Sequence, residues 1–242
     1  GAKREPPLKI MGTWDPPEWK VLGAVFAARF PTIQVQYIRS ARDGREMQSL
    51  MAYQAGRYVT DVLSSFSTNY TELKAAGALT DLRELPNFSR LMNGAYGREG
   101  LWIGQRISFW CIAYNTNLVA PKDLPVEWDD LLTNPFWRDG RFAVSNTASG
   151  WLTSLYAEKG AAWAKDFVTR LFTEVKPQRR KEGREASVKL AAAGEMMGVA
   201  PSSDYRVRQV ADRGAPISLH CPSLVPTSAE WLGLFKGSPA QN

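Results

Sequence analysis

Short apolar runs and helix-like patterns alternate along this chain. Residues 8–11 form an apolar run that predicts a strand, and a polar turn leads from it into a helix expected from about Pro17 to Arg29. Apolar and polar residues then alternate at 33–38, as in a half-buried strand. Because strands and helices keep alternating, the pattern predicts an α/β fold with mostly parallel sheets.

Strands and helices continue to alternate along the rest of the chain. A helix is expected at 43–55, with Met47, Leu50 and Met51 on one face, and a strand at 59–63. A third helix is expected at 71–76. The strongest strand signal is the apolar run at 106–118, and later strands are expected at 141–144, 199–200 and 217–221.

Composition indicates an ordinary soluble globular protein. The 242 residues are 44% hydrophobic and 22% charged, and the net charge is +6. The densest basic run, at 176–184, is interrupted by Pro177, Glu182 and Gly183, so it indicates a solvated surface loop rather than a nucleic-acid site. No apolar run approaches the ~20 residues that span a bilayer. The sequence shows no secretory signal, but mature secreted proteins have lost theirs, so this absence does not bear on localisation.

The cysteines leave two structures open. Cys111 lies in the apolar run at 106–118, and Cys221 follows another apolar run. Two buried free thiols and a disulfide are both compatible with this pattern, and a disulfide would indicate an oxidising compartment. With His220 as the single histidine and no CxxC pair, neither a metal site nor a Cys-His catalytic pair is expected. No cofactor is expected either.

Several phrases occur in an order that resembles one protein family. The run at 106–118 ends in Tyr-Asn-Thr-Asn-Leu and is followed by a Pro-rich turn and a Trp-Asp-Asp-Leu-Leu phrase at 128–132. Shorter phrases are Ala-Gly-Arg at 55–57, Asp-Val at 61–62, Ala-Gly-Ala-Leu at 76–79, Ala-Gly-Glu at 193–195, Arg-Gly-Ala-Pro at 213–216 and Lys-Gly-Ser-Pro at 236–239. In this order they resemble the bacterial periplasmic solute-binding proteins of ABC importers, family 1, ferric-ion-binding-protein-like group.

The resemblance implies a type II periplasmic-binding-protein fold. Two α/β lobes would be joined by crossing strands near Cys111 and near 217–221, which could bring the two cysteines close together. We expect lobe 1 at 1–110, lobe 2 at 111–217 and a return crossing toward lobe 1 at 218–242. Family members continue with several more helices, so the C-terminal part is expected to be short or missing, with some apolar surface left uncovered.

Candidate ligand-binding residues lie mostly in loops that follow strands, where open α/β sheets bind their ligands. The loop at 145–151 provides either an N-cap or backbone N–H groups for an anion. The resemblance implies the anion, since ferric-type members hold phosphate or carbonate at the matching Ser-Gly step. Arg106 is expected either at the protein surface or bound to a carboxylate or phosphonate of the solute. Trp14 and Phe66 are expected either to pack in the core or to stack on the solute. The candidates are Thr13, Trp14, Ser40, Ser65, Phe66, Arg106, Trp110, Asn146, Thr147, Ser149, Gly150, Ser203 and Tyr205.

The resemblance also bears on the kind of solute. Ferric-binding members use two adjacent tyrosines in one loop, whereas this chain has Asp204-Tyr205 and no Tyr-Tyr pair. We therefore expect a periplasmic monomer that captures a small organic anion, such as a carboxylate or phosphonate, and docks on the membrane subunits of an importer. The alternatives are a ferric-ion and anion binder, an enzyme with a cysteine nucleophile, and a sensor on the same fold.

Overall fold

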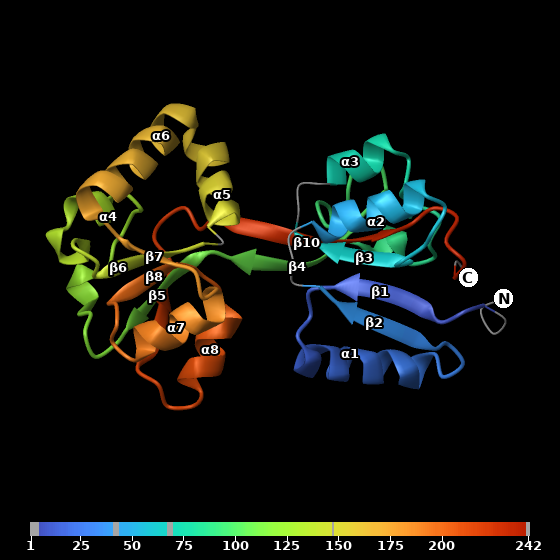
Figure 1. Cartoon of the computed structure of the whole chain (residues 1–242), viewed down its shortest axis with the longest axis horizontal. Coiled ribbons are helices and arrows are strands. Elements are labelled where there is room, and N and C mark those ends of the chain that lie inside the picture. Colours follow the sequence, from blue (N-terminus) through green and yellow to red (C-terminus); the bar gives the residue numbers. More distant parts are fainter. Residues whose placement is uncertain (1–4, 41–43, 67–69, 147, 241–242) are drawn as a thin grey trace. The chain divides into compact units, whose positions relative to one another are not determined.

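The structure is a computed structural model that describes residues 5–40, 44–66, 70–146 and 148–240. The chain divides into two compact units (Figure 1). Unit 1 comprises Gly1–Arg106 and Ala229–Asn242, and unit 2 comprises Ile107–Ser228. Unit 2 is therefore one continuous segment, whereas unit 1 is formed by the N-terminal and C-terminal segments of the chain together.

Unit 1 is built on a five-stranded sheet in the order β2-β1-β3-β10-β4. Strand β1 pairs in parallel with β2 and β3, while β10 runs antiparallel to β3 and places Trp231 opposite Ser65. The elements are β1 (Leu8–Gly12), α1 (Pro16–Arg29), β2 (Val35–Arg39), α2 (Arg45–Gln54), β3 (Val62–Ser65), α3 (Tyr70–Ala75), a 3-10 turn (Phe88–Arg90), β4 (Ile103–Phe109) and β10 (Thr227–Leu234).

The core of unit 1 lies around β3. Leu63 from β3 and Leu73 from α3 are completely buried, and Leu50 from α2 joins the same cluster. Helix α1 buries none of its side chains, and Val21 and Val25 are each 65% exposed. This agrees with the expectation that some apolar surface stays uncovered.

Unit 2 is also built on a five-stranded sheet, in the order β7-β6-β8-β5-β9. Strand β6 pairs in parallel with β7 and β8, and β5 pairs antiparallel with β8 and β9. The strands are β5 (Cys111–Asn115), β6 (Phe142–Ser145), β7 (Gln178–Arg180), β8 (Gly198–Ser202) and β9 (Ile217–His220). The helices are α4 (Asp130–Thr133), α5 (Ser149–Lys159), α6 (Ala161–Arg170), α7 (Arg184–Ala192) and α8 (Asp204–Ala211), with 3-10 turns at Pro121–Asp123 and Pro135–Trp137 and a π turn at Leu171–Val175.

Both faces of the unit 2 sheet carry apolar clusters. Figure 1 shows α5 and α6 on one side of the sheet and α7 and α8 on the other. The first side buries Trp128, Trp137 and Trp151 completely, and the second buries Val188 and Val199. Covering both faces suits parallel strands whose sequences are continuously apolar.

Two expectations differ from the structure in detail. The return crossing was expected at 218–242, but β9 belongs to the sheet of unit 2 and the chain re-enters unit 1 through β10. The predicted apolar face of the second helix was wrong: α2 buries Leu50 but leaves Met47 and Met51 38% and 66% exposed. The buried side of α2 instead carries Arg45 and Glu46, which pair with each other and with neighbours described below.

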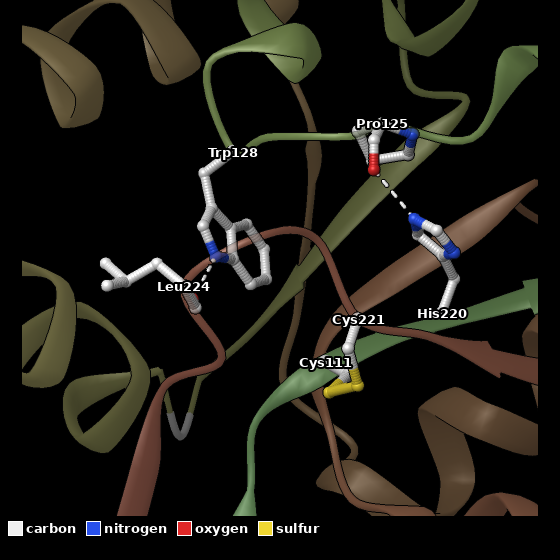
Figure 2. The surroundings of a disulfide bond; sticks show 6 residues. All are labelled: Cys111, Pro125, Trp128, His220, Cys221 and Leu224. Atoms are coloured by element: carbon white, nitrogen blue, oxygen red, sulfur yellow. Dashed lines mark hydrogen bonds between the residues drawn. A yellow bond between two sulfur atoms is a disulfide. The ribbon is translucent and has the colours of Figure 1, made fainter.

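The two cysteines form a disulfide (Figure 2). Ile112 of β5 pairs with His220 of β9, so the next step along this register brings Cys111 and Cys221 to a Cα–Cα distance of 4.7 Å. The chain after Cys221 is held to the rest of unit 2, since the indole of Trp128 donates to the carbonyl of Leu224 at 3.1 Å. Neither thiol is free.

Candidate functional site

A buried carboxylate organises the edge of the unit 1 sheet where β1 and β3 end. Glu230 of β10 is completely buried. It accepts hydrogen bonds from the hydroxyls of Thr13 and Ser64, the latter at 2.6 Å, and forms an ion pair with Arg106. Sequence reasoning missed Glu230, although one acidic residue inside an apolar strand was a signal, because such a charge needs a partner.

Arg106 lies in this unit 1 network. Besides its ion pair with Glu230, its guanidinium lies 3.7 Å from a carboxylate oxygen of Glu18 and donates to Thr13 Oγ1 at 3.1 Å. The guanidinium also covers the ring of Phe66, at 5.3 Å from the ring centroid. The structure thus joins three predicted site residues, Thr13, Phe66 and Arg106, and surrounds the arginine with carboxylates of its own unit.

Trp14 packs in an aromatic cluster of unit 1. Its ring centroid lies 5.8 Å from that of Trp19 and 5.6 Å from that of Tyr37. The hydroxyl of Tyr37 donates to the carbonyl of Trp14 at 2.9 Å. Burial, followed by the negative charge of Glu230, raises the pKa of Tyr37 to about 12. The packing that the sequence left open for Trp14 is therefore present, and stacking on a solute stays a prediction.

A second buried pair engages the other two unit 1 candidates. Arg45 and Glu46, at the start of α2, form an ion pair at 3.4 Å. Arg45 donates to the carbonyl of Ser40 at 2.8 Å, and the hydroxyl of Ser65 donates to Glu46. Successive residues of a strand point to opposite faces, so Ser64 and Ser65 serve two different networks.

In unit 2, three neighbouring parallel strands end at one edge, and a helix starts after each. Strand β6 leads to α5, β7 to α7 and β8 to α8. The register pairs Ser145 with Arg180 and Val144 with Ala200, so the three ends lie side by side. Helix starts expose backbone N–H groups and a partial positive charge, which suits an anion.

The predicted unit 2 residues lie around this edge. The backbone N–H of Asn146 donates to the carbonyl of Arg180 at 2.9 Å, which fixes the loop after β6 against the end of β7. Gly150 stands in the first turn of α5. Thr147 and the side chain of Ser149 lie outside the described residues.

Trp110 connects two of the helix starts. Its indole is buried and donates through Nε1 to the hydroxyl of Ser228 at 3.1 Å. A Cβ added to Gly150 would lie 3.3 Å from the same nitrogen, so glycine lets α5 begin close to the indole. The guanidinium carbon of Arg184, at the start of α7, lies 4.6 Å from the indole centroid. Sequence reasoning missed Arg184, because it interpreted the basic run at 176–184 as solvated.

Ser203 precedes α8 and is 2% exposed. Within the described part of the chain its buried hydroxyl has no hydrogen-bond partner, and it does not cap α8. Tyr205 follows in the first turn, with the guanidinium of Arg206 at 5.0 Å from its ring centroid. A buried hydroxyl that has no partner among the described residues leaves a hydrogen bond for an external polar group to make at this edge.

The described residues contain no group of three or more histidine, cysteine, aspartate or glutamate side chains arranged to hold a metal ion. Nor does any of their helices combine the length and the apolar character required to cross a bilayer.

Comparisons with known proteins bear on the fold. No family model and no curated protein matches the chain. Solved structures do match. Iron-bound HitA from Pseudomonas aeruginosa superposes with a TM-score of 0.79 at 22% identity, covering 96% of this chain and 76% of HitA. The substrate-binding protein of an ABC transporter from Agrobacterium tumefaciens gives a TM-score of 0.78 at 13% identity, with 96% and 70% covered.

A third match carries a different ligand. The periplasmic binding protein AfuA from Actinobacillus pleuropneumoniae, with fructose-6-phosphate bound, gives a TM-score of 0.76 at 16% identity, with 96% of this chain and 74% of AfuA covered. The predicted fold class is confirmed: the chain has the α/β fold of periplasmic binding proteins. At these identities the likeness establishes the fold alone.

Proposed function

We propose that the protein is the solute-binding component of an ABC import system and captures a small organic anion. The observation that carries this proposal is the edge of unit 2, where the starts of α5, α7 and α8 meet beside the buried hydroxyl of Ser203. Helix starts favour carboxylate, phosphonate or phosphate groups. A sugar phosphate bound to AfuA, which shares the fold, supports this ligand class.

Iron is the second candidate, because HitA shares the fold and binds iron. A hard trivalent cation needs several anionic oxygen ligands close together. The first turn of α8 offers the single phenol of Tyr205, and the described residues hold no group of three or more His, Cys, Asp or Glu side chains suited to a metal. We therefore propose an organic anion as the solute and keep iron as the second candidate.

The enzyme alternative required a cysteine nucleophile. Cys111 and Cys221 are joined to each other, so neither offers a thiolate for attack. The disulfide also supports an oxidising compartment such as the periplasm. Within this proposal the protein acts there as a monomer that delivers its solute to the membrane subunits of an importer.

A thermal-shift screen tests the proposal. The panel contains inorganic phosphate, fructose 6-phosphate, citrate, a phosphonate, uncharged sugars, and Fe(III) with and without carbonate. A ligand at 100 times its Kd adds ~2.7 kcal/mol to the stability of the folded state, which raises Tm by several degrees. Stabilisation by an anion alone is the expected result. Stabilisation by iron only, or by none of these solutes, would overturn the assignment.

A further inference from the structure

We propose that Asn93 is a site of spontaneous covalent modification, at which the backbone nitrogen of Gly94 converts the side-chain amide into a carboxylate. In the first step this nitrogen attacks the side-chain carbonyl carbon of Asn93, and the new C–N bond closes a five-membered succinimide ring. The proton of the Gly94 N–H and the side-chain NH2 group leave together as ammonia. Solvent water then opens the ring at either carbonyl carbon. The products are aspartate and isoaspartate, and each adds one negative charge to unit 1.

The surroundings of Asn93 are open to solvent. Asn93 and Gly94 are both exposed, and the preceding Met92 is 79% exposed. A Cβ added to Gly94 would meet no atom within 4 Å, so solvent has free access to its nitrogen. No packed side chain therefore stands in the way of ring closure.

The backbone places the two reacting residues at the centre of a turn. The N–H of Ala95 donates to the carbonyl of Met92 at 3.0 Å, and Gly94 has a φ of +85°. This left-handed conformation favours glycine, and glycine also hinders attack by its own nitrogen least, because it carries no side chain. One surface hydrogen bond closes the turn, so the rotation at Asn93 that brings the two groups together disrupts few other contacts.

The state of the attacking nitrogen distinguishes Asn93 from another exposed asparagine, Asn117. The nitrogen that follows Asn117 belongs to Leu118, which donates to the carbonyl of Asn115 at 3.2 Å. That hydrogen bond retains the proton and fixes the nitrogen, and the leucine side chain adds steric hindrance. Within the described part of the chain, the N–H of Gly94 donates to no other backbone group. Exposure alone would treat the two asparagines alike, whereas the backbone favours reaction at Asn93.

The modification would alter the connection into β4. Tyr96 forms a β-bridge with Ile103, and the N–H of Gly104 donates to the carbonyl of Ala95 at 2.7 Å. Isoaspartate lengthens the backbone of the turn by one atom, because the chain then continues through the side-chain carbon. The pairing between this turn and the start of β4 should therefore loosen as the protein ages.

The test incubates the full-length protein without ligand at about pH 6 and about pH 9. Peptide mapping by mass spectrometry measures the conversion of Asn93, with Asn117 as the control in the same digest. Methyl transfer by an isoaspartyl methyltransferase measures isoaspartate. The control variant is Asn93→Gln, which would have to close a less favourable six-membered ring and replaces an exposed side chain by a similar one.

We expect Asn93 to react roughly tenfold faster than Asn117, which corresponds to about 1.4 kcal/mol in the reaction barrier. Conversion should be faster at the higher pH, because the attacking nitrogen must lose its proton, and isoaspartate should be absent from Asn93→Gln. If Asn93 stays intact, or if Asn117 reacts as fast, the inference is wrong. Conversion of Asn93 to aspartate without isoaspartate would also overturn it, since direct hydrolysis forms no ring. The inference is independent of the proposed function, which each of these results leaves unchanged.

Discussion

Glu230 shows how one buried charge can arrange several side chains. Its carboxylate lies in an apolar strand and has no access to solvent. The hydroxyls of Thr13 and Ser64 donate hydrogen bonds to it, and Arg106 forms an ion pair with it. A buried ion pair adds little net stability when intact, but removing one partner leaves the other charge uncompensated. We therefore expect Glu230 to be intolerant of change even though it touches no solute in the proposed mechanism.

We predict that Glu230→Gln lowers the free energy of unfolding by about 3 kcal/mol, the lower end of the range for broken buried pairs, since Arg106 retains some solvent contact. Urea denaturation followed by circular dichroism measures the loss. Glu174→Gln is the control, because it removes the partner of Arg170 from an exposed pair and should leave the urea midpoint unchanged. Equal midpoints for the two variants would contradict the role given to Glu230.

At the scale of elements, β8 is the strand on which unit 2 depends most. It lies in the middle of the sheet, parallel to β6 on one side and antiparallel to β5 on the other. Its first residue, Gly198, sits against the ring of Trp137 and the side chain of Ile112. A side chain has no room there, so glycine is required for the close approach of the ring to the strand.

Gly198→Ala should therefore destabilise the protein. The new Cβ would lie 2.9 Å from Trp137 and 3.3 Å from the carbonyl oxygen of Ala113, and neither the buried ring nor the backbone can move away easily. Overpacking of this kind costs about 1–3 kcal/mol. Thermal unfolding measures it against Gly104→Ala, whose Cβ would be at an ordinary 3.4 Å from its nearest neighbour. An unchanged Tm for Gly198→Ala would show that the ring relocates.

Helices and strands could be predicted from the sequence where the buried side chains are also the hydrophobic ones. The first strand, the helix after it and the strand around Val199 were predicted close to their observed bounds. The single strand expected at 106–118 was wrong in its bounds, because this stretch contains the end of β4 (Ile103–Phe109) and β5 (Cys111–Asn115), which belong to different sheets. The apolar face predicted for helix α2 was wrong because its buried face includes the paired charges of Arg45 and Glu46, which a hydrophobic pattern assigns to the surface. Local patterns carry no information on which distant charges become partners.

The loops of the candidate site could be predicted from the sequence, but the contacts between distant residues could not. Loops at strand ends could be identified from the strand pattern, and this located Asn146, Gly150 and Ser203. The contact of Arg184 with Trp110 and the ion pair of Glu230 with Arg106 could not be predicted, because the partners are distant in sequence. Only the sheet registers bring such residues together.

At the scale of the whole molecule, the disulfide closes unit 2 upon itself. Cys111 lies shortly after the chain enters this unit at Ile107, and Cys221 shortly before it leaves at Ser228. The bond therefore ties the two ends of an almost complete unit, at a sequence separation of 110 residues. Cross-links that close long loops restrict the unfolded chain most.

Reduction of this bond should lower the free energy of unfolding by about 4–5 kcal/mol, the value that chain entropy predicts for a loop of this length. Urea denaturation with and without reductant measures the difference. The double variant Cys111→Ala with Cys221→Ala should resemble the reduced protein and should not respond to reductant. If reductant shifts neither protein, the bond does not contribute as described.

The position of β10 in the chain affects how the protein folds during its synthesis. A ribosome delivers residues in order, and unit 2 has received all its strands once Ser228 is made. The unit 1 sheet still lacks β10, which lies between β3 and β4, so the edge of β3 remains open until Leu234 follows. An open edge invites pairing with other chains. We therefore expect the unit that comes second in the chain to fold first, and a nascent unit 1 to depend on protection until its last strand arrives.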